Sequence, residues 1–360
     1  MNILLLGGTG VMGNPLAKIL AEDNYVYVTS RKNRKTNLKQ IEYLCGNAHD
    51  ADWVKEIVSR HKIEVIVDFM VYSFGELEER LECYLDNCKQ YVFLSSSRVY
   101  APNDGEIDES SPRLLDICKD ADYLKTNEYA LSKAREEDLI TSFKKKNWTI
   151  IRPYITYGSH RLQLGVYEKE QWLYRCIQGR TIVCSEEMIN NYTTLTLGYD
   201  VSRMIAKVVG NRNCFGQIYQ LTCNKPVKWG QVLKVYIDTI ETVTGKKPKI
   251  KLVKTTSELG ASVLNPYQWN YDRKFNRKFN SDKIERDVWG GDYEWTDPLN
   301  GLRECLIEFL QEGNSSFQYI SWKSEAVLDR LTRERTPLSV FENWKDKCKY
   351  LIGRYTPFLI

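Results

Sequence analysis

The feature that most constrains the fold is a glycine-rich turn at residues 7–13, directly after the apolar run Ile3–Leu6. A short continuous apolar run is typical of a strand buried on both faces of a parallel sheet. The turn carries glycines at positions 7, 10 and 13, and helical spacing of apolar residues begins at Asn14. A strand, a glycine turn and a helix in this order are typical of a dinucleotide-binding unit, because the turn lets the backbone approach a pyrophosphate and the free N–H groups at the helix start favour its negative charge.

Apolar runs and amphipathic stretches then alternate as far as residue 152. Strands are predicted at Ile3–Leu6, Tyr25–Val28, Glu64–Phe69, Gln90–Ser95 and Trp148–Arg152. Helices are predicted at Asn14–Glu22, Ala51–Arg60, Leu77–Cys88 and Tyr129–Phe143. Strands that alternate with helices over about 150 residues predict an α/β fold with a Rossmann-type, doubly wound parallel sheet.

The second half of the chain is less regular. It contains helical patterns at Glu170–Gln178, Val201–Val209, Gly230–Val243 and Asn300–Leu310, and strand patterns at Ile218–Leu221 and Pro248–Val253. We expect a Rossmann dinucleotide-binding domain at residues 1–165, which also takes back about 195–220, and an interleaved, smaller mixed α/β substrate lobe at 166–310. Residues 311–360 are expected to form a C-terminal extension that packs back on the fold or makes an oligomer contact.

The end of the second predicted strand bears on the choice of dinucleotide. A carboxylate about twenty positions after the glycine turn would hold the ribose 2′-OH of NAD(H). Residues 28–35 contain no carboxylate, and Ser30 and Arg31 stand at that point. An arginine there can accept a 2′-phosphate through charge-assisted hydrogen bonds. The loop therefore favours NADP(H) as the cofactor, with NAD(H) possible and a solvated basic loop as the alternative.

Two further motifs point to proton chemistry. Tyr129 and Lys133 are four residues apart at the start of a predicted helix, so the phenol and the ammonium share one helical face. A nearby cation favours phenolate, and a tyrosine of that kind can exchange a proton with a hydroxyl or a carbonyl oxygen. The second motif, residues 95–97, supplies three serines at the carboxyl end of a predicted strand, the edge at which open α/β sheets bind ligands. A serine hydroxyl there could bond the same substrate oxygen.

Five segments together resemble the extended short-chain dehydrogenase/reductase superfamily, the NAD(P)-dependent nucleotide-sugar epimerases, dehydratases and reductases. They are GGTGVMG at 7–13, SSSRVY at 95–100, YALSK at 129–133, IIRPYITYG at 150–158 and Tyr199-Asp200-Val201. The resemblance covers about residues 1–310 and is specific for the superfamily, not for one substrate.

The resemblance implies roles for individual residues. Tyr129 would be the acid/base, Lys133 would lower its pKa and hold the nicotinamide ribose, and Ser96 would assist, with Ser95 and Ser97 as close rivals. The expected cofactor contacts are Gly7, Thr9, Gly10, Val11, Met12, Gly13, Ser30, Arg31, Asn47, Ala48, Phe69, Met70, Tyr129 and Lys133. Asn47 stands where aspartate is commoner, and Phe69-Met70-Val71 replaces the usual small-residue stretch.

Substrate contacts are expected from Ser97, Arg98, Tyr154 and Arg273. In the 4,6-dehydratases of the family an Asp-Glu pair follows the catalytic threonine, whereas Ser97 and Arg98 stand here, which disfavours a standard dehydratase. The leading hypothesis is hydride transfer at sugar C4 by a 4-keto sugar reductase. The alternatives are a nucleotide-sugar 4-epimerase that retains NAD, and a non-catalytic nucleotide- or RNA-binding member of the fold.

Composition bounds the remaining possibilities. The formal charge of +4 is too small to require a nucleic-acid partner. The ten cysteines include no CxxC pair, so free thiols are expected, and the three histidines have no metal-ligand spacing, so no metal is expected. The run Ile3–Leu6 is too short to span a bilayer and has neither the basic n-region nor the cleavage-site pattern of a signal peptide, which predicts a cytoplasmic protein. By family resemblance we expect a homodimer through helices near residues 76–88 and 129–143.

Overall fold

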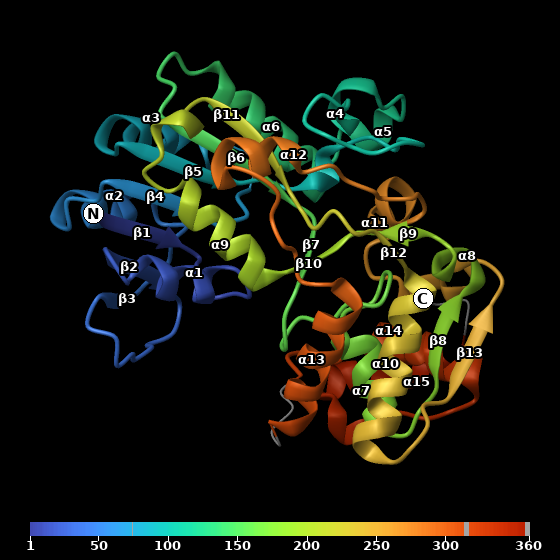
Figure 1. Ribbon diagram of the computed structural model, residues 1–360. Helices are drawn as coiled ribbons and strands as arrows, with labels where there is room; N and C mark the ends of the chain where they lie inside the picture. The colour runs from blue at the N-terminus through green and yellow to red at the C-terminus, as the bar shows by residue number, and fades with distance from the viewer. Residues whose placement is uncertain (74, 313–316, 357–360) are drawn as a thin grey trace.

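The core of the protein is one sheet of seven parallel strands. The computed structural model describes residues 1–73, 75–312 and 317–356. The strand order is β11-β6-β5-β4-β1-β2-β3, with the helices on both faces (Figure 1). The strands are β1 (Asn2–Leu6), β2 (Tyr25–Ser30), β3 (Ile41–Cys45), β4 (Val65–Asp68), β5 (Gln90–Leu94), β6 (Trp148–Pro153) and β11 (Gln217–Leu221). The predicted Rossmann-type α/β fold is confirmed.

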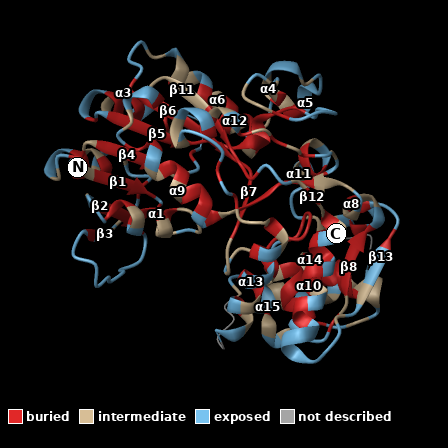
Figure 2. Ribbon diagram, viewed as in Figure 1, coloured by how far each residue is buried: buried red, intermediate tan, exposed pale blue. Residues whose placement is uncertain are grey.

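Alternate residues of β1 pack on opposite faces of the sheet, which explains its continuous apolar run. Ile3 and Leu5 belong to the core on the side of α1 and α9. Leu4 and Leu6 belong to the core on the other side, under α2, α3 and α6. All four side chains are fully buried, as the red strands of Figure 2 show. The helices are α1 (Gly13–Leu20), α2 (Ala51–Arg60), α3 (Glu78–Asn87), α6 (Tyr129–Ser142) and α9 (Gly198–Val208).

The edge strand β3 was not predicted from the sequence. It pairs in parallel with β2, from Ile41 opposite Val26 to Cys45 opposite Ser30. Only Ile41 of its five residues is buried. An edge strand of this kind has no apolar run to reveal it, because one face of it is left to solvent.

Residues 198–221 return to the central sheet after the chain has entered the second lobe. Helix α9 covers the face that also carries α1, and β11 pairs in parallel with β6, so residues 198–221 belong with the first domain. Ile284 of α12 (Asp282–Ile284) and the aromatic rings of Tyr293 and Trp295 also join that core. Among the described residues, no helix is long and apolar enough to cross a bilayer.

A second lobe lies beside the carboxyl ends of the strands (Figure 1). It is built from α7 (Lys169–Ile177), α10 (Trp229–Thr244), α13 (Pro298–Gln311), β8 (Ile182–Ser185) and β13 (Ile250–Val253), with β13 parallel to β8. The shorter elements between the two parts are α4 (Leu114–Ile117), α5 (Ala121–Leu124), β7 (Ile155–Tyr157), α8 (Glu186–Ile189), β9 (Tyr192–Thr193), β10 (Leu195–Leu197), β12 (Val227–Lys228) and α11 (Pro266–Gln268).

The described part of the C-terminal extension packs on this lobe as two helices, α14 (Trp322–Thr332) and α15 (Trp344–Tyr355). Arg175 of α7 is fully buried and pairs with Glu325 at 2.9 Å and with Asp329 at 2.8 Å. Tyr350 of α15 donates its hydroxyl to Asp329 at 2.7 Å. A buried ion network therefore ties both helices to α7. Residues 313–316 and 357–360 of the predicted extension lie outside the described residues.

Candidate functional site

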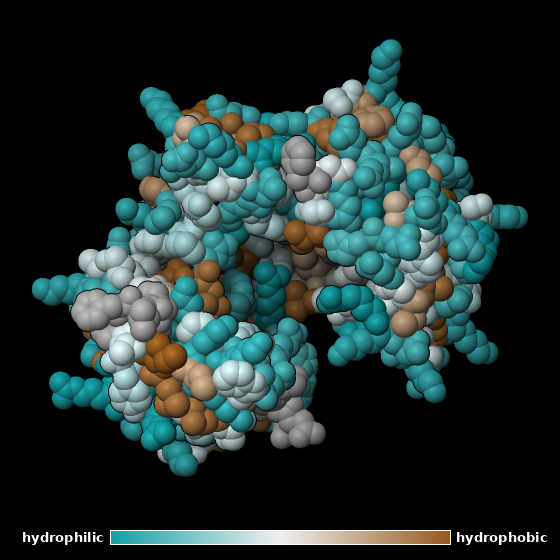
Figure 3. Space-filling view, turned by 180° about the vertical axis from the view of Figure 1, so that it is seen from behind, coloured by the Kyte–Doolittle hydropathy of each residue, from teal (hydrophilic) through white to brown (hydrophobic). Residues whose placement is uncertain are grey.

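A cavity of about 1400 Å³ lies where the two lobes meet. Its wall comes from the glycine turn, the ends of β4 and β5, the start of α6, β7 and the loop after it, and the second lobe. The space-filling view shows the molecule hollowed at this place, with hydrophilic and hydrophobic side chains both reaching the hollow (Figure 3). The cavity is therefore at the carboxyl edge of the parallel sheet, where open α/β folds bind ligands.

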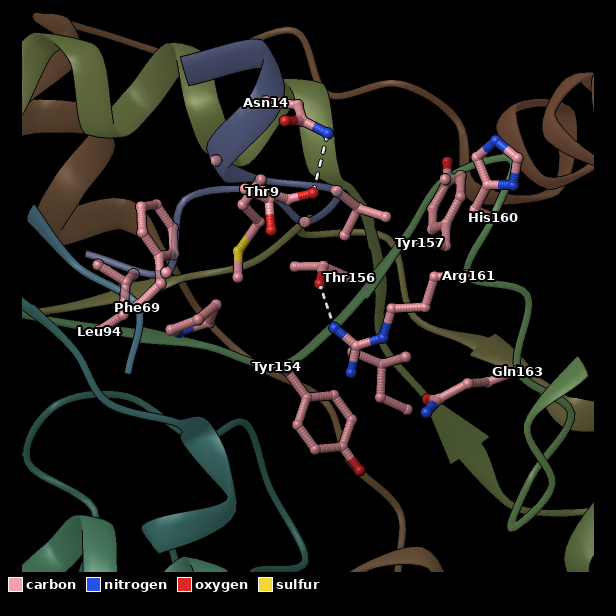
Figure 4. Close-up of a pocket in the computed structure, with 18 of the residues that line it drawn as sticks. Thr9, Asn14, Phe69, Leu94, Tyr154, Thr156, Tyr157, His160, Arg161 and Gln163 are labelled. Carbon is pink, nitrogen blue, oxygen red and sulfur yellow. Dashed lines mark hydrogen bonds between the residues drawn. The ribbon is translucent and has the colours of Figure 1, made fainter. Parts of the chain in front are cut away.

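The glycine turn has the shape that a dinucleotide pyrophosphate requires. Gly7 has φ +69°, which side chains rarely tolerate, and a Cβ on Gly13 would lie 2.5 Å from the Cα of Gly8. A Cβ on Gly10 would meet nothing within 4 Å, so this glycine faces open cavity. Helix α1 has no side-chain cap at Met12. In its first turn the N–H of Asn14 bonds the Gly10 carbonyl oxygen and Pro15 has no N–H, so the N–H of Gly13 is the one left for a ligand. In the close-up, Asn14 holds the turn through its bond to the Thr9 carbonyl oxygen (Figure 4).

The three serines after β5 have different partners. Ser95 donates its hydroxyl to Glu137 at 2.5 Å, and Ser97 donates to the Arg152 carbonyl oxygen at 2.8 Å. Ser96 Oγ instead accepts the N–H of Arg98 at 3.2 Å, which leaves its hydroxyl hydrogen available. Ser95 and Ser96 line the cavity, but Ser97 does not. Of the three rivals, Ser96 alone combines a place on the wall with an uncommitted hydroxyl hydrogen.

Tyr129 and Lys133 both line the cavity from the start of α6. Glu128 caps this helix by accepting the N–H of Ala130 at 2.8 Å, so the helix begins at Tyr129. Lys133 is 1% exposed, and its Nζ donates to the carbonyl oxygen of Met70 at 2.9 Å. The ammonium also lies 4.3 Å from the ring centroid of Phe93. The protein thus holds the lysine between α6, β5 and the segment after β4.

Buried carboxyl groups surround Lys133. Glu136 Oε2 lies 3.0 Å from Lys133 Nζ. Burial raises the pKa of Glu136 to about 7, although Lys133 opposes the rise. Burial also raises the pKa of Asp68, which accepts hydroxyl hydrogen bonds from Tyr72 and Tyr91 at 2.6 and 2.8 Å. Lys133 therefore lies near carboxyl groups that burial makes reluctant to ionise and whose ionised form the lysine favours.

Arginines and carboxylates form a buried cluster beside Tyr129. Arg98 Nη2 pairs with Glu128 at 2.5 Å, and Arg273 donates to Asp272 and to the Tyr154 hydroxyl. Burial pushes the pKa of Asp272 upward, but the arginines at 273, 277 and 98 outweigh it and hold that pKa below its usual value. Asp272 consequently stays ionised as the common anchor of the cluster.

Most of the predicted site residues line the cavity. They are Gly7, Thr9, Gly10, Val11, Met12, Gly13, Phe69, Met70, Ser96, Arg98, Tyr129, Lys133, Tyr154 and Arg273.

Five predicted residues lie elsewhere. Arg31 is exposed in the loop after β2, and Ser30 Oγ is engaged with the backbone of Lys32. Asn47 Oδ1 accepts the N–H of His49, and the carbonyl oxygen of Ala48 accepts a bond from Arg80. Ser97 donates its hydroxyl to the carbonyl oxygen of Arg152 in β6 and does not line the cavity, so it stabilises the fold.

Sequence reasoning did not single out several polar residues of the wall. Arg34 lines the cavity three positions after Arg31, and Lys18 of α1 lines it as well. Arg161 donates to Thr156 Oγ1 at 3.1 Å and reaches into the centre of the view in Figure 4. No spacing in the sequence marks Arg34 and Arg161, because loops place them.

Comparisons with known proteins agree with this geometry. A family model described as Male sterility protein matches residues 80–196, a stretch that includes Ser96, Tyr129 and Lys133. No curated protein has significant sequence similarity to the chain.

Many solved structures share the fold at low sequence identity. WbmH of Bordetella bronchiseptica, in complex with NAD⁺, is 13% identical with a TM-score of 0.66, over 87% of this chain and 99% of that one. The dTDP-glucose 4,6-dehydratase of Bacillus anthracis, in complex with NAD, is 18% identical with a TM-score of 0.63, over 87% and 98%. The UDP-N-acetylglucosamine 4-epimerase of Methanobrevibacter ruminantium, in complex with UDP-N-acetylmuramic acid, is 14% identical with a TM-score of 0.66, over 86% and 98%. The chain therefore shares the fold of these nucleotide-sugar enzymes, which is the fold that the resemblance drawn from its motifs implied.

Proposed function

We propose that this protein is an NAD(P)-dependent oxidoreductase that reduces the 4-keto group of a nucleotide-linked sugar, with Tyr129 as acid/base. The observation that carries the proposal is the meeting of Ser96, Tyr129 and Lys133 with the glycine turn on the wall of one cavity. The structures that share the fold include nucleotide-sugar enzymes bound to NAD and to a UDP-sugar, which supports the same substrate class.

The residues present fit a nicotinamide dinucleotide. The open face of Gly10 and the uncapped start of α1 would hold the pyrophosphate, and Lys133 would hold the nicotinamide ribose. When bound, the cofactor supplies the hydride that reduces the sugar carbon. The hydroxyl of Tyr129 gives its proton to the sugar oxygen, while Ser96 donates a hydrogen bond to that oxygen. The ammonium of Lys133 stabilises the phenolate that remains.

The cofactor is proposed to be NADP(H). The carboxylates on the cavity wall within the described residues, Glu168, Glu170 and Glu308, all come from the second lobe, so none stands at the end of β2 to hold a 2′-OH. Arg34 lines the cavity, whereas Arg31 does not, so Arg34 would accept the 2′-phosphate in place of Arg31.

The proposal is tested by NADPH oxidation across a panel of nucleotide-linked 4-keto sugars. We expect turnover with at least one of them, and a loss of about 100-fold or more in Tyr129→Phe, since acid–base catalysis typically contributes that much. Tyr25→Phe, which changes an exposed tyrosine of β2, is the matched control. No turnover with any panel member, or unchanged turnover in Tyr129→Phe, would contradict the proposal.

A nucleotide-sugar 4-epimerase is the second candidate, favoured by the fold shared with a 4-epimerase. It would use the same three residues but would keep its cofactor through the cycle. Acid release of bound small molecules followed by mass spectrometry separates the two. Stoichiometric NAD(H) indicates the epimerase, whereas an empty protein that binds NADPH more tightly than NADH indicates the reductase. The homodimer and the cytoplasmic location stay predictions from the sequence.

A further inference from the structure

The outer face of α15 carries a row of exposed apolar and aromatic side chains. This apolar stripe consists of Trp344, Cys348, Ile352 and Tyr355. Its members are three or four residues apart, so they share one face of the helix. Trp344 is 69% exposed, Ile352 50% and Tyr355 61%. Single exposed apolar residues are common on proteins, but a continuous row of them is typical of a surface that a partner covers.

The opposite face of α15 is fixed to the protein. Tyr350 and Gly353 are the buried residues of the helix. Tyr350 donates its hydroxyl to Asp329 at 2.7 Å, and the carbonyl oxygen of Gly353 accepts a bond from Arg330 at 2.8 Å. The helix cannot turn the stripe inward without breaking these bonds. The stripe therefore stays on the outside of the second lobe, where the space-filling view shows hydrophobic side chains gathered (Figure 3).

Basic side chains border the stripe on both sides. Lys345 and Lys349 each come one position after a stripe residue and lie along one edge. Lys347 and Arg354 each come one position before a stripe residue and lie along the other edge. No carboxylate of the described residues forms an ion pair with any of the four. The one carboxylate of the helix, Asp346, is half-buried and lies outside the stripe. The border therefore favours a partner with negative charge.

We propose that α15 docks this protein on the surface of a bilayer that carries anionic lipid headgroups. The stripe would enter the boundary between headgroups and acyl chains, the depth that the amphipathic rings of tryptophan and tyrosine prefer. The lysines and the arginine would keep their aliphatic stems along that boundary and bring their charges to the lipid phosphates. Polybasic segments are attracted to anionic leaflets in the same way.

Two other occupants fit the stripe less well. A second copy of the chain would place this patch opposite itself across a twofold axis, and the basic borders of the two copies would repel each other. An acidic polypeptide would match the charge, but it would need a groove of its own for a convex helix face. A bilayer interface takes up such a face without any complementary shape.

The test is flotation of the full chain with lipid vesicles at two salt concentrations. Vesicles of phosphatidylcholine alone are compared with vesicles that also contain phosphatidylglycerol, in a ratio of about two to one. We expect the bound fraction to rise about fivefold or more with the anionic lipid at about 0.05 M salt. It should fall by about half or more at about 0.5 M salt, because salt screens the attraction. No binding to the anionic vesicles, or equal binding to both compositions, overturns the proposal.

A charge placed in the stripe assigns the binding to α15. Ile352→Asp is expected to lower the bound fraction about fivefold or more, because a carboxylate would have to enter the apolar boundary. Leu264→Asp is the matched control, at a leucine that is 53% exposed elsewhere on the chain. It should leave the bound fraction unchanged. Binding that survives Ile352→Asp, or that falls equally in Leu264→Asp, contradicts the role of the stripe.

The basic border is tested by charge reversal. Lys345→Glu combined with Lys349→Glu should lower binding to the anionic vesicles about fivefold or more. Lys246→Glu combined with Lys247→Glu makes the same change of charge at exposed lysines after α10 and should bind as the wild type does. An equal loss in both double variants would mean that net charge alone drives binding, and it overturns the assignment to α15. Vesicle binding is the readout, so the result does not depend on the proposed function.

Sedimentation without vesicles identifies the other occupants. Self-association that Ile352→Asp abolishes, together with no vesicle binding, would mean that a second copy covers the stripe. Binding of polyglutamate by the wild type but not by Ile352→Asp, again without vesicle binding, would indicate an acidic polypeptide. Either result overturns the proposal of a bilayer surface.

Discussion

Lys133 Nζ donates a hydrogen bond of 2.9 Å to the carbonyl oxygen of Met70, which joins the start of α6 to the segment after β4. Glu136, one turn further along α6, holds the same ammonium from the other side. Groups of the protein itself therefore fix the lysine at the cavity wall. A side chain that is already held in place loses little conformational entropy when a ligand binds to it.

The pH dependence of stability should reveal the burial of Glu136. Its pKa is raised to about 7 in the folded protein, so its contribution to stability is fully present below the unfolded pKa and is lost as pH rises toward 7. Between pH 5 and 8 the wild type is expected to lose up to about 3 kcal/mol relative to Glu136→Gln. Urea denaturation at intervals across this range measures the difference. Glu79→Gln, at an exposed glutamate of α3, is the control. Parallel pH profiles for wild type and Glu136→Gln would contradict the account.

Two glycines of the turn should respond differently to alanine. Gly13→Ala would put a methyl group 2.5 Å from the Cα of Gly8, so we expect a loss of about 1–3 kcal/mol in stability. Gly10→Ala meets no protein atom within 4 Å, so the fold should be unaffected, within about 0.5 kcal/mol. Its methyl group would instead occupy the pyrophosphate position, and affinity for NADPH should fall at least tenfold. Thermal denaturation and titration with NADPH check both variants. Full affinity in a folded Gly10→Ala protein would place the dinucleotide elsewhere.

Cofactor preference should depend on Arg34 more than on Arg31. Both side chains are exposed in the loop after β2, but only Arg34 lines the cavity. Arg34→Ala is expected to lower the affinity ratio of NADPH to NADH by about tenfold, the effect of one charge-assisted contact of about 1.4 kcal/mol. Arg31→Ala is the matched control and should change the ratio by less than about twofold. A larger change of the affinity ratio in Arg31→Ala than in Arg34→Ala would instead indicate that Arg31 binds the 2′-phosphate.

The C-terminal helices should be required for the stability of the second lobe. Asp329 is fully buried and accepts bonds from Arg175, Tyr350 and Thr336. Asp329→Ala leaves Arg175 with less compensation, and breaking a buried pair typically costs about 3–5 kcal/mol. Chemical denaturation measures the loss, with Glu342→Gln at an exposed position as the control. A loss below about 1 kcal/mol would mean that α14 and α15 are only loosely attached.

The parts of the fold that local patterns encode were predictable. The continuous apolar run of β1, the helix at Ala51–Arg60 and the helix start at Tyr129 are found where the sequence places them. Each depends on neighbouring residues: apolar spacing, the cap by Asp50 and the cap by Glu128. The glycine turn was equally predictable, because the backbone at Gly7 and the close contact at Gly13 require glycine.

Features that depend on tertiary placement were not predictable. The edge strand β3 buries only Ile41 of its five residues, so no burial pattern in the sequence marked it. The family resemblance favoured Ser96 but left Ser95 and Ser97 as close rivals, and only their hydrogen bonds separate the three. Arg34 and Arg161 reach the cavity from loops, where no periodic pattern indicates which side chains face it. The ion network between α7 and α14 joins residues about 150 positions apart, beyond the reach of any local pattern.

The most direct test of the central claim follows the hydride itself. NADPH deuterated at C4, in each of its two stereoisomers, is incubated with the protein and the nucleotide-linked 4-keto sugar that it turns over, and the product is examined by mass spectrometry. The account predicts one deuterium on the sugar carbon from one stereoisomer only, and transfer slowed about 100-fold or more in Tyr129→Phe. Product without deuterium from either stereoisomer, or transfer at the wild-type rate in Tyr129→Phe, would contradict it.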